Sequence, residues 1–219
     1  MKSIYLLFYI FKNYSVCRIL QILFVKDIIL NGSVLEIGAY KGSNKNFSNF
    51  LKISNNKFLY ADKKKINNNI IIDLEKKNYI KKKFDNVLIF NVLEHVYDVN
   101  NAIVEIKNLL NKKGKVICST PFLYRYHKAP NDYCRYTEDF LIKIFKENKF
   151  VNIKISALGF GPFVAAYGML FDLIKFLYPL NSFILIICIF FDFLLNVIFK
   201  NKLIKIYPIC YVLSANKIS

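Results

Sequence analysis

The chain has 219 residues, of which 55% are hydrophobic and 16% aromatic, and it carries a formal net charge of +17. This length suits one domain with a sizeable core, and the apolar content excludes a disordered chain and points to a membrane contact. Lysine supplies nearly all the positive charge. Because base reading favours arginine forks, the composition argues against nucleic acid as a partner and favours anionic lipid headgroups.

The cysteines and the N-terminal segment bear on the compartment. The five cysteines are widely spaced and contain no CxxC pair, which predicts reduced thiols in the cytosol, with no disulfide frame, no zinc site and no other metal. Residues 3–26 are apolar, with helical spacing after Val16 and no small-residue cleavage site, so they are expected to be helices that cap the domain or lie on a membrane, not a secretion signal.

Strand and helix patterns alternate from residue 33 onward. A helix bearing Phe47, Phe50 and Leu51 on one face is expected after the first strand, a second helix over 99–110 with Gly114 as its stop, and a third opened by Thr137. This alternation predicts an α/β fold with a mostly parallel sheet covered on both faces. The seven expected strands cover residues 33–38, 57–62, 69–73, 85–91, 115–119, 150–156 and 207–215.

An apolar insertion separates the sixth and seventh strands. Residues 158–200 are almost wholly apolar, and the run from Phe183 to Phe199 is slightly short for a membrane span and contains Asp192 and Asn196. A single crossing would leave the seventh strand on the wrong side to join the sheet. We therefore expect a helical hairpin that enters one leaflet or packs as a lid. The alternative is an ordinary buried helix pair, with Asp192 facing the protein.

The predicted organisation has three parts. Residues 1–30 form N-terminal helices, residues 31–157 and 203–219 form the α/β domain, and residues 158–202 form the apolar helical insertion. No internal repeat or linker-like stretch interrupts this order.

Acidic residues end three successive predicted strands. Glu36 stands two residues before Gly38, Asp62 ends the second strand and Asp73 ends the third. In open α/β sheets, ligands bind beyond the carboxyl ends of the strands, and a glycine turn there lets the backbone approach them. Carboxylates suit a ligand with ammonium and ribose hydroxyl donors, such as S-adenosylmethionine. A glycine that only turns the chain is the simpler alternative for the first loop.

Three stretches resemble class I S-adenosylmethionine-dependent methyltransferases. "VLEIGAYKGSN" resembles their first motif, and "FDNVLIFNVLEHVYDVNNAIVEIKNLLNKKGKVICSTPF" resembles the segment from their fourth strand to just past the fifth. "HKAPNDYCRYT" is similar to the His-x-x-Pro-x-Asp-Tyr-x-Arg-Tyr-Thr loop of a bacterial subgroup associated with cell-surface polysaccharide or lipid-linked sugar pathways. The resemblance covers about residues 30 to 155 and implies a Rossmann-like three-layer sandwich, whose reversed seventh strand matches "YPICYVLSANK".

The resemblance implies a cofactor site for S-adenosylmethionine. Asp62 would bind the ribose, Asp73 and Leu74 would bracket the adenine, and Asn91 would sit beneath the sulfonium. The residues that would line the methionine end are Glu36, Gly38 and Gly42. Tyr40 departs from the family pattern, because it stands where the commonest first motif has a glycine, and it would narrow the cradle.

The loop after the fifth strand supplies candidates for the transfer step. A hydroxyl acceptor benefits from a general base, and His127 is the leading candidate because its ordinary pKa is near neutrality. Asp132 and Arg135 either pair and hold the loop or, through Arg135, grip an anionic acceptor. His95 is a minor candidate for a second base, and a structural role is the alternative for both histidines.

These observations predict a methyltransferase that acts on an oxygen or nitrogen of a small or lipid-linked acceptor. It would be cytoplasmic and associated with the inner face of the cell membrane, through a peripheral or monotopic contact of residues 158–200. One alternative is a catalytically degenerate scaffold protein of the same fold, which Tyr40 supports. Another is a nicotinamide-dependent α/β enzyme, which Glu36 and the reversed seventh strand oppose.

Overall fold

The computed structural model describes residues 2–53, 58–128, 130–200 and 202–218. Contacts within the chain divide it into two compact units. The sheet unit comprises Val25–Thr120, His127–Ser156 and Val212–Ser219, and the helical unit comprises Met1–Phe24, Pro121–Tyr126 and Ala157–Tyr211. The domain boundaries expected from the sequence stay a prediction.

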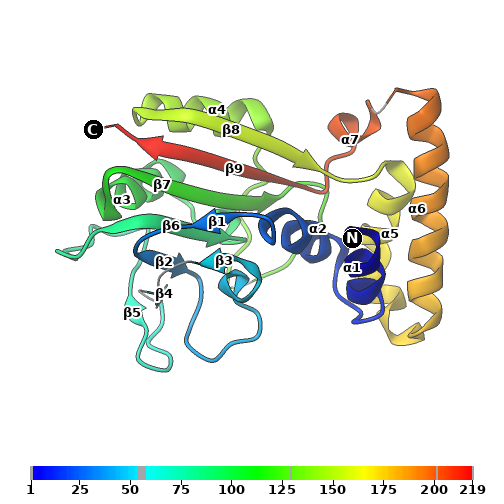
Figure 1. The fold of residues 1–219 in the computed structure, drawn as a ribbon, viewed down its shortest axis with the longest axis horizontal. Coiled ribbons are helices and arrows are strands. Elements are labelled where there is room, and N and C mark those ends of the chain that lie inside the picture. The colour runs from blue at the N-terminus through cyan, green and yellow to red at the C-terminus, as the bar shows by residue number, and fades with distance from the viewer. Residues whose placement is uncertain (1, 54–57, 129, 201, 219) are drawn as a thin grey trace. The chain divides into compact units, whose positions relative to one another are not determined.

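A seven-stranded mixed sheet has the order β5-β4-β2-β6-β7-β9-β8. Neighbouring strands from β5 to β7 pair in parallel, whereas β9 runs in the opposite direction (Figure 1). The predicted Rossmann-like sheet with a reversed last strand is therefore confirmed. Its strands are β2 (Val34–Ile37), β4 (Phe58–Asp62), β5 (Ile70–Ile71), β6 (Phe84–Phe90), β7 (Leu110–Pro121), β8 (Phe150–Leu158) and β9 (Cys210–Lys217).

Strand order reverses between β2 and β6, because the chain first builds β4 and β5 on one side of β2 and then returns to the other side. All four residues of β2 and most residues of β6 are buried, as their continuous apolar runs predict for central parallel strands. The carboxyl ends of β2, β4 and β6 consequently meet at one edge of the sheet. This reversal is where open α/β sheets bind ligands.

The helix predicted after the first strand is wrong. In its place the structure has a single 3₁₀ turn, Phe47–Phe50, and a two-stranded parallel sheet of β1 (Ile29–Leu30) and β3 (Lys52–Ile53). Asn46 and Leu51, on either side of the turn, both have extended backbones. Serine and asparagine within the turn are weak helix formers, so nothing local extends it.

Gly114 does not stop a helix, which is a second correction. Helix α3 (Val99–Leu109) ends five residues earlier, and β7 begins directly at Leu110. The β6–β7 register shifts between Phe84 and Asn86, and a Cβ on Gly114 would lie 3.1 Å from the carbonyl oxygen of Phe84. The same Cβ would lie only 2.9 Å from the carbonyl oxygen of Asn111 in β7 itself, so glycine fits there because backbone approaches from both strands. Helix α4 (Glu138–Glu147) does begin as predicted, with Thr137 accepting a hydrogen bond from the Phe140 amide.

The helical unit is built from five helices in the part of the chain that the structure describes. They are α1 (Lys2–Ile10), α2 (Val16–Val25), α5 (Pro162–Ile174), α6 (Leu180–Ile198) and the short α7 (Leu203–Ile206). Helices α5 and α6 pack against each other as a hairpin. The predicted helices within residues 3–26 and 158–200 are thus present.

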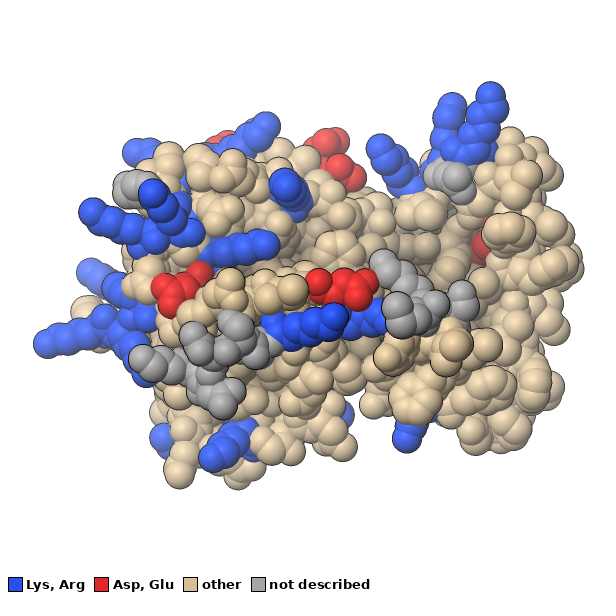
Figure 2. All heavy atoms as spheres, in the orientation of Figure 1, with Lys and Arg blue, Asp and Glu red and all other residues tan. Residues whose placement is uncertain are grey.

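Much of the apolar surface of α6 is exposed. This helix alone, among the described residues, is long and apolar enough to cross a membrane, judged by length and composition only, and 28% of its most apolar window is buried. Most of this window is therefore exposed, whereas Asp192 faces the protein, as the alternative of a buried helix pair expected, and a membrane contact of α6 stays a prediction. Figure 2 shows a mostly uncharged surface around α6. The exposed side chains are Leu180, Phe183, Ile187, Phe190, Phe191, Phe193, Leu194, Val197 and Ile198.

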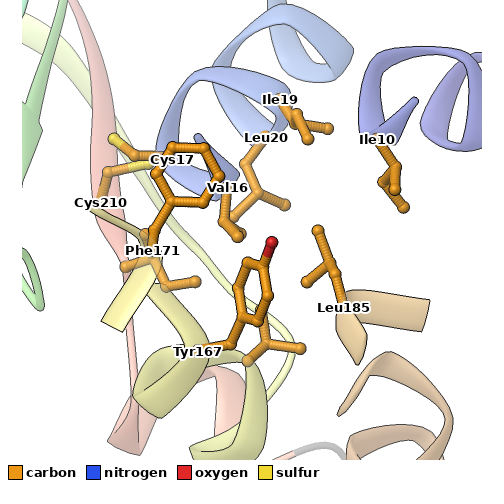
Figure 3. Close-up of a cluster of buried hydrophobic side chains, with 11 residues drawn as sticks. Ile10, Val16, Cys17, Ile19, Leu20, Tyr167, Phe171, Leu185 and Cys210 are labelled. Atoms are coloured by element: carbon orange, nitrogen blue, oxygen red, sulfur yellow. The ribbon is translucent and has the colours of Figure 1, made fainter. Parts of the chain in front are cut away.

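The inner faces of these helices share one apolar core. Tyr167 and Phe171 of α5 and Leu185 of α6 pack with Val16 and Leu20 of α2 (Figure 3). Hydrogen bonds fix α1 at the start of α6: the Ser182 hydroxyl donates to the Ile10 carbonyl oxygen at 3.2 Å, and the Asn181 amide donates to Asn13 Oδ1 at 2.8 Å. The inward-facing apolar side chains of these helices thus form the core of the helical unit.

Asp192 is a buried acid that joins the two helices of the hairpin. Its side chain is fully buried, and its two oxygens accept hydrogen bonds from the backbone amides of Phe163 and Val164 at 3.0 and 2.8 Å. These amides belong to the first turn of α5, where the helix itself supplies no acceptor. Asp192 therefore caps α5 and directs the opposite face of α6 outward.

Replacing Asp192 tests this cap. Asp192→Ala leaves two buried amides without acceptors and is expected to lower the free energy of unfolding by about 2 kcal/mol. Asp192→Asn keeps one acceptor oxygen and should lose less. The measurement is urea unfolding followed by circular dichroism in a mild detergent. Equal stability of Asp192→Ala and the parent chain would contradict the capping role.

Candidate functional site

Glu36 closes the first loop of the site. It lies in β2, is 3% exposed, and accepts hydrogen bonds from the backbone amides of Phe47 and Ser48 at 2.7 and 3.1 Å. A buried carboxylate requires such donors, and here they come from the first amides of the 3₁₀ turn. The segment between Gly38 and Asn46 is thereby tied back onto the strand. A contact between Glu36 and a ligand ammonium stays a prediction.

Gly38 and Gly42 of this loop share a positive φ but differ in what surrounds them. Both have positive φ, +81° at Gly38 and +88° at Gly42, where other residues are strained. A Cβ on Gly38 would lie 2.5 Å from Val92 Cγ2, whereas a Cβ on Gly42 would meet no atom within 4 Å. Packing against Val92 therefore explains Gly38, while the backbone at Gly42 borders open space. An exposed backbone beside a strand end is the geometry of a ligand cradle.

The acids predicted to face the ligand follow adjacent strands. Asp62 ends β4, where its register partner is Ile71 of β5, and Asp73 comes two residues after β5. The Asp62 carboxylate accepts the Lys64 amide at 2.9 Å, and Asp73 accepts the Glu75 amide at 3.1 Å. Both acids therefore stabilise turns at the sheet edge. Their roles toward ribose and adenine stay predictions.

Leu74 and Asn91 lie in more restricted surroundings. Leu74 is 4% exposed, and its carbonyl oxygen accepts a hydrogen bond from the Asn101 side chain at 2.8 Å. Asn91 follows β6 with φ +55°, and its amide donates to the Ser119 carbonyl oxygen of β7 at 2.9 Å. Asn91 thus marks the end of β6, where the chain turns into the 3₁₀ helix Leu93–His95.

Glu94 is a site residue that sequence analysis missed. It lies in a short 3₁₀ helix, Leu93–His95, directly after β6, and it is fully buried. Neither carboxylate oxygen has a hydrogen-bond partner among the described residues. Burial raises the pKa of Glu94 to about 8, and the Glu94 backbone amide and the Arg135 guanidinium oppose this shift only in part. The signal in the sequence was a lone acid inside the apolar run "NVLEHV".

The predicted catalytic residues gather around Glu94. The rings of His95 and His127 meet edge to face, with centroids 4.9 Å apart, and His95 Nε2 lies 3.8 Å from Glu94 Oε1. His127 Nδ1 lies 3.4 Å from Asp132 Oδ2. Two histidines and one carboxylate thus converge at the end of β6, within the sheet unit.

Asp132 and Arg135 hold the loop, as one of the two alternatives predicted. The guanidinium donates to both carboxylate oxygens, at 2.5 and 2.7 Å, and the His127 amide also donates to Asp132 at 2.7 Å. The hydrogen bonds from Arg135 lower the pKa of Asp132 to about 2, with the His127 amide adding to the effect and burial opposing it. This pair leaves Asp132 ionised and charge-compensated.

Backbone contacts fasten the same loop to the 3₁₀ helix that contains Glu94. The Tyr133 amide donates to the Glu94 carbonyl oxygen at 2.9 Å, and the Tyr136 hydroxyl donates to the Leu93 carbonyl oxygen at 3.2 Å. Burial raises the pKa of Tyr136 well above its usual range, so this phenol stays protonated and remains a donor. The loop therefore has a fixed place over the end of β6.

The shifted pKa of Glu94 predicts a pH-dependent stability. The raised pKa means that folded Glu94 keeps its proton from about pH 4.5 to about pH 8, where the unfolded chain releases it. This contribution to stability is therefore complete below the lower value and is lost as pH rises through the upper one, by about 1.4 kcal/mol per pKa unit at most.

Urea unfolding in a chelator, at about pH 5 and about pH 8, measures this effect. Glu94→Gln removes the proton equilibrium but keeps the shape, so its stability relative to the parent chain should increase with pH by a few kcal/mol. A difference that stays constant across this range would show that Glu94 titrates normally.

Comparison with known proteins agrees with this architecture. A family model described as "Methyltransferase domain" matches residues 10–155, well over half of the chain. No curated protein sequence matches. Among solved structures, a methyltransferase from Thermotoga maritima, described as a possible histamine N-methyltransferase, has a TM-score of 0.57 at 13% identity, with 96% of this chain and 92% of that chain covered.

Two further solved structures share the fold. A SAM-dependent methyltransferase from Archaeoglobus fulgidus has a TM-score of 0.51 at 16% identity, and 84% of this chain and 86% of that chain are covered. A phosphoethanolamine N-methyltransferase from Haemonchus contortus, in complex with S-adenosyl-L-methionine, has a TM-score of 0.55 at 15% identity. That comparison covers 100% of this chain but 58% of the nematode protein, so the chain spans little more than half its length. At these identities the likeness concerns the fold, and the family match supplies the assignment: the chain belongs to the methyltransferase-domain family, with the class I fold.

Proposed function

We propose that this chain transfers a methyl group from S-adenosylmethionine to an oxygen or nitrogen of a small or lipid-linked acceptor. The observation that carries the proposal is the loop after β2, where a Cβ on Gly42 would meet no atom within 4 Å, together with the acid Asp62 at the end of the adjacent strand β4. The family match provides independent support. Relatives in the solved structures bind S-adenosylmethionine, which makes it the first cofactor to test.

The residues present fit this cofactor. The loop tied by Glu36 keeps a glycine backbone open to a ligand, which Gly42 allows because no side chain fills that space. Asp62 offers a carboxylate at the end of the neighbouring strand, the position from which ribose hydroxyls are bound in dinucleotide folds. Asp73 lies one strand further, near Leu74, where an adenine amino group would find an acceptor.

His127 is the proposed general base for an acceptor hydroxyl. When bound, S-adenosylmethionine supplies an already activated methyl group, so the protein mainly aligns the partners and excludes water. His127 is 27% exposed at its side chain, which leaves it accessible, and the carboxylate of Asp132 lies against its Nδ1 atom. Asp132 thereby favours a proton on Nδ1 and acts as a positioning residue, itself held by Arg135.

The helical unit supports an amphiphilic acceptor and a membrane contact. Besides α6, large apolar side chains of α1 and α5 are exposed, among them Ile4, Phe8, Leu170 and Leu173. Lys200, Lys202 and Lys205 follow α6, and positive side chains gather near that end in Figure 2. An apolar face with lysines at its border is typical of a helix in the interface of an anionic bilayer.

The proposed contact involves one leaflet, at the inner face of the cell membrane. The hairpin leaves the sheet after β8 and returns to it at β9, so both of its ends belong on one side of the bilayer. Helix α5 has 13 residues, fewer than the roughly 20 that a crossing requires. Monotopic insertion satisfies both conditions, whereas a single crossing by α6 does not.

Cofactor binding is tested by calorimetry with S-adenosylmethionine and with its demethylated product. The parent chain should bind both, and Asp62→Asn should weaken binding by about 10- to 100-fold, because a charge-assisted hydrogen bond to ribose contributes roughly 1.5–3 kcal/mol. Glu147→Gln, an exposed change on α4, is the matched control and should bind normally. Binding of neither compound by the parent chain would instead favour a scaffold protein.

The acceptor and the membrane contact are tested together with methyl-labelled cofactor and a membrane-lipid extract. Label should enter the lipid fraction, and the chain should sediment with vesicles that contain an anionic phospholipid. Phe190→Glu combined with Leu194→Glu should reduce both, because charges on the exposed face of α6 oppose insertion.

Tyr79→Glu changes a still more exposed aromatic residue of the sheet unit and should have no effect. Calorimetry on the same variants separates a lost membrane contact from a lost cofactor site. A chain that stays soluble without detergent and does not sediment with vesicles would contradict the membrane part of the proposal.

A further inference from the structure

Glu94, His95 and His127 form a cluster whose chemistry exceeds that of a single general base. Each residue offers one ligand atom, and these atoms all lie within 4.8 Å of one another. The cluster contains both histidines of the chain. All three residues belong to the sheet unit, so their arrangement is set within one compact body.

The state of Glu94 calls for a partner. Its side chain is fully buried, and within the described part of the chain no other residue donates a hydrogen bond to either carboxylate oxygen. Buried polar groups in native proteins are almost always satisfied, and one that is not indicates a missing water or ion or a functional role. His95 Nε2 lies 3.8 Å from Glu94 Oε1, beyond hydrogen-bond distance.

The histidines are oriented as metal ligands usually are. His95 Nδ1 lies 2.5 Å from the Asn131 carbonyl oxygen, which places a proton on Nδ1 and leaves the lone pair on Nε2, the atom that faces Glu94. His127 Nδ1 lies farther from its oxygen neighbour, 3.4 Å from Asp132 Oδ2, and the His127 amide donates to the same carboxylate oxygen. Such oxygen acceptors behind the imidazoles fix the tautomer and orientation of metal-binding histidines.

The charge around the cluster suits a cation. Asp132 is neutralised by its bidentate pair with Arg135, so Glu94 supplies the negative charge that a divalent ion would meet. Two imidazoles exclude Mg²⁺ and Ca²⁺ as preferred ions, since these choose oxygen ligands, and favour zinc and its first-row neighbours. Ligand atoms in a tetrahedral zinc site lie roughly 3.3 Å apart. Side-chain rotations that move the ligand atoms by about 1–2 Å would therefore complete the geometry.

We propose that Glu94, His95 and His127 bind a divalent first-row transition ion of the zinc class. Three protein ligands leave a coordination position open, as in catalytic zinc sites, and an acceptor oxygen or a water would occupy it. The ion would also join the 3₁₀ helix Leu93–His95 to the loop that begins at His127. This inference goes beyond the proposed methyl transfer and does not depend on it. With the ion bound, His127 would be a ligand and not the base, and an acceptor oxygen or water on the ion would lose its proton more readily.

The test uses the full chain without an affinity tag, stripped with a chelator that is then removed. Titration with Zn²⁺ in a calorimeter should reveal one tight site, and titration with Co²⁺ should give visible absorption bands of a four- or five-coordinate ion. Glu94→Gln and His127→Gln should each weaken Zn²⁺ binding by tenfold or more, by analogy with lost ligands or supporting groups in metal sites.

Cys134→Ser is the matched control, because Cys134 is a partly exposed thiol in the same loop and could bind these ions by itself. It should leave binding unchanged. Absence of a tight site in the parent chain, or a site that survives His127→Gln, would overturn the proposal, as would a cobalt spectrum that disappears with Cys134→Ser. His127→Gln keeps the test valid if Glu94→Gln fails to fold, since His127 lies on a partly exposed loop.

Discussion

The hydrogen bonds from the Phe47 and Ser48 amides to the buried carboxylate of Glu36 are the contact on which the rest of the candidate site depends. They hold the first loop against β2, the strand at which the sheet order reverses. With the loop tied in this way, a Cβ on Gly42 would still meet no atom within 4 Å. A charge buried in a central strand needs donors, and this need fixes where the chain goes after the strand.

The two buried acids at this edge of the sheet differ in what surrounds them. Glu36 accepts two backbone hydrogen bonds and connects the first loop to β2. Glu94 lies next to the end of β6 without a donor among the described residues, and its raised pKa reflects that burial. A satisfied buried acid stabilises a fold, whereas an unsatisfied one is retained for a ligand or for chemistry.

The apolar residues of the helical unit fall into two groups, one buried in a core and one exposed. The buried core joins α2, α5 and α6, and the Asp192 side chain caps the first turn of α5. The remaining aromatic and aliphatic side chains of α6 point outward over most of its length. An exposed apolar surface of this extent is typical of a binding surface, and the lysines that follow α6 favour a bilayer as its partner.

The local patterns were sufficient for the elements whose stability is local. Alternating apolar runs gave the seven strands, Thr137 marked the start of α4, and the spacing of Asp132 and Arg135 anticipated their pair. The family resemblance supplied the reversed direction of β9, which no single stretch encodes. The sequence by itself therefore determined the fold class and brought Asp62 and Asp73 to one edge of the sheet, where ligand binding stays a prediction.

Tertiary contacts decided the rest. After the first strand the weak helix formers allow only one 3₁₀ turn, whose amides bind the buried carboxylate of Glu36, and Gly114 lies in β7 where the β6–β7 register shifts. Asp192 of α6 caps α5, so the face of α6 that contains Asp192 is turned toward α5 and the opposite face is turned outward. The convergence of Glu94, His95 and His127 joins residues more than 30 positions apart, and spacing along a chain does not reveal which side chains a folded loop brings within reach of each other.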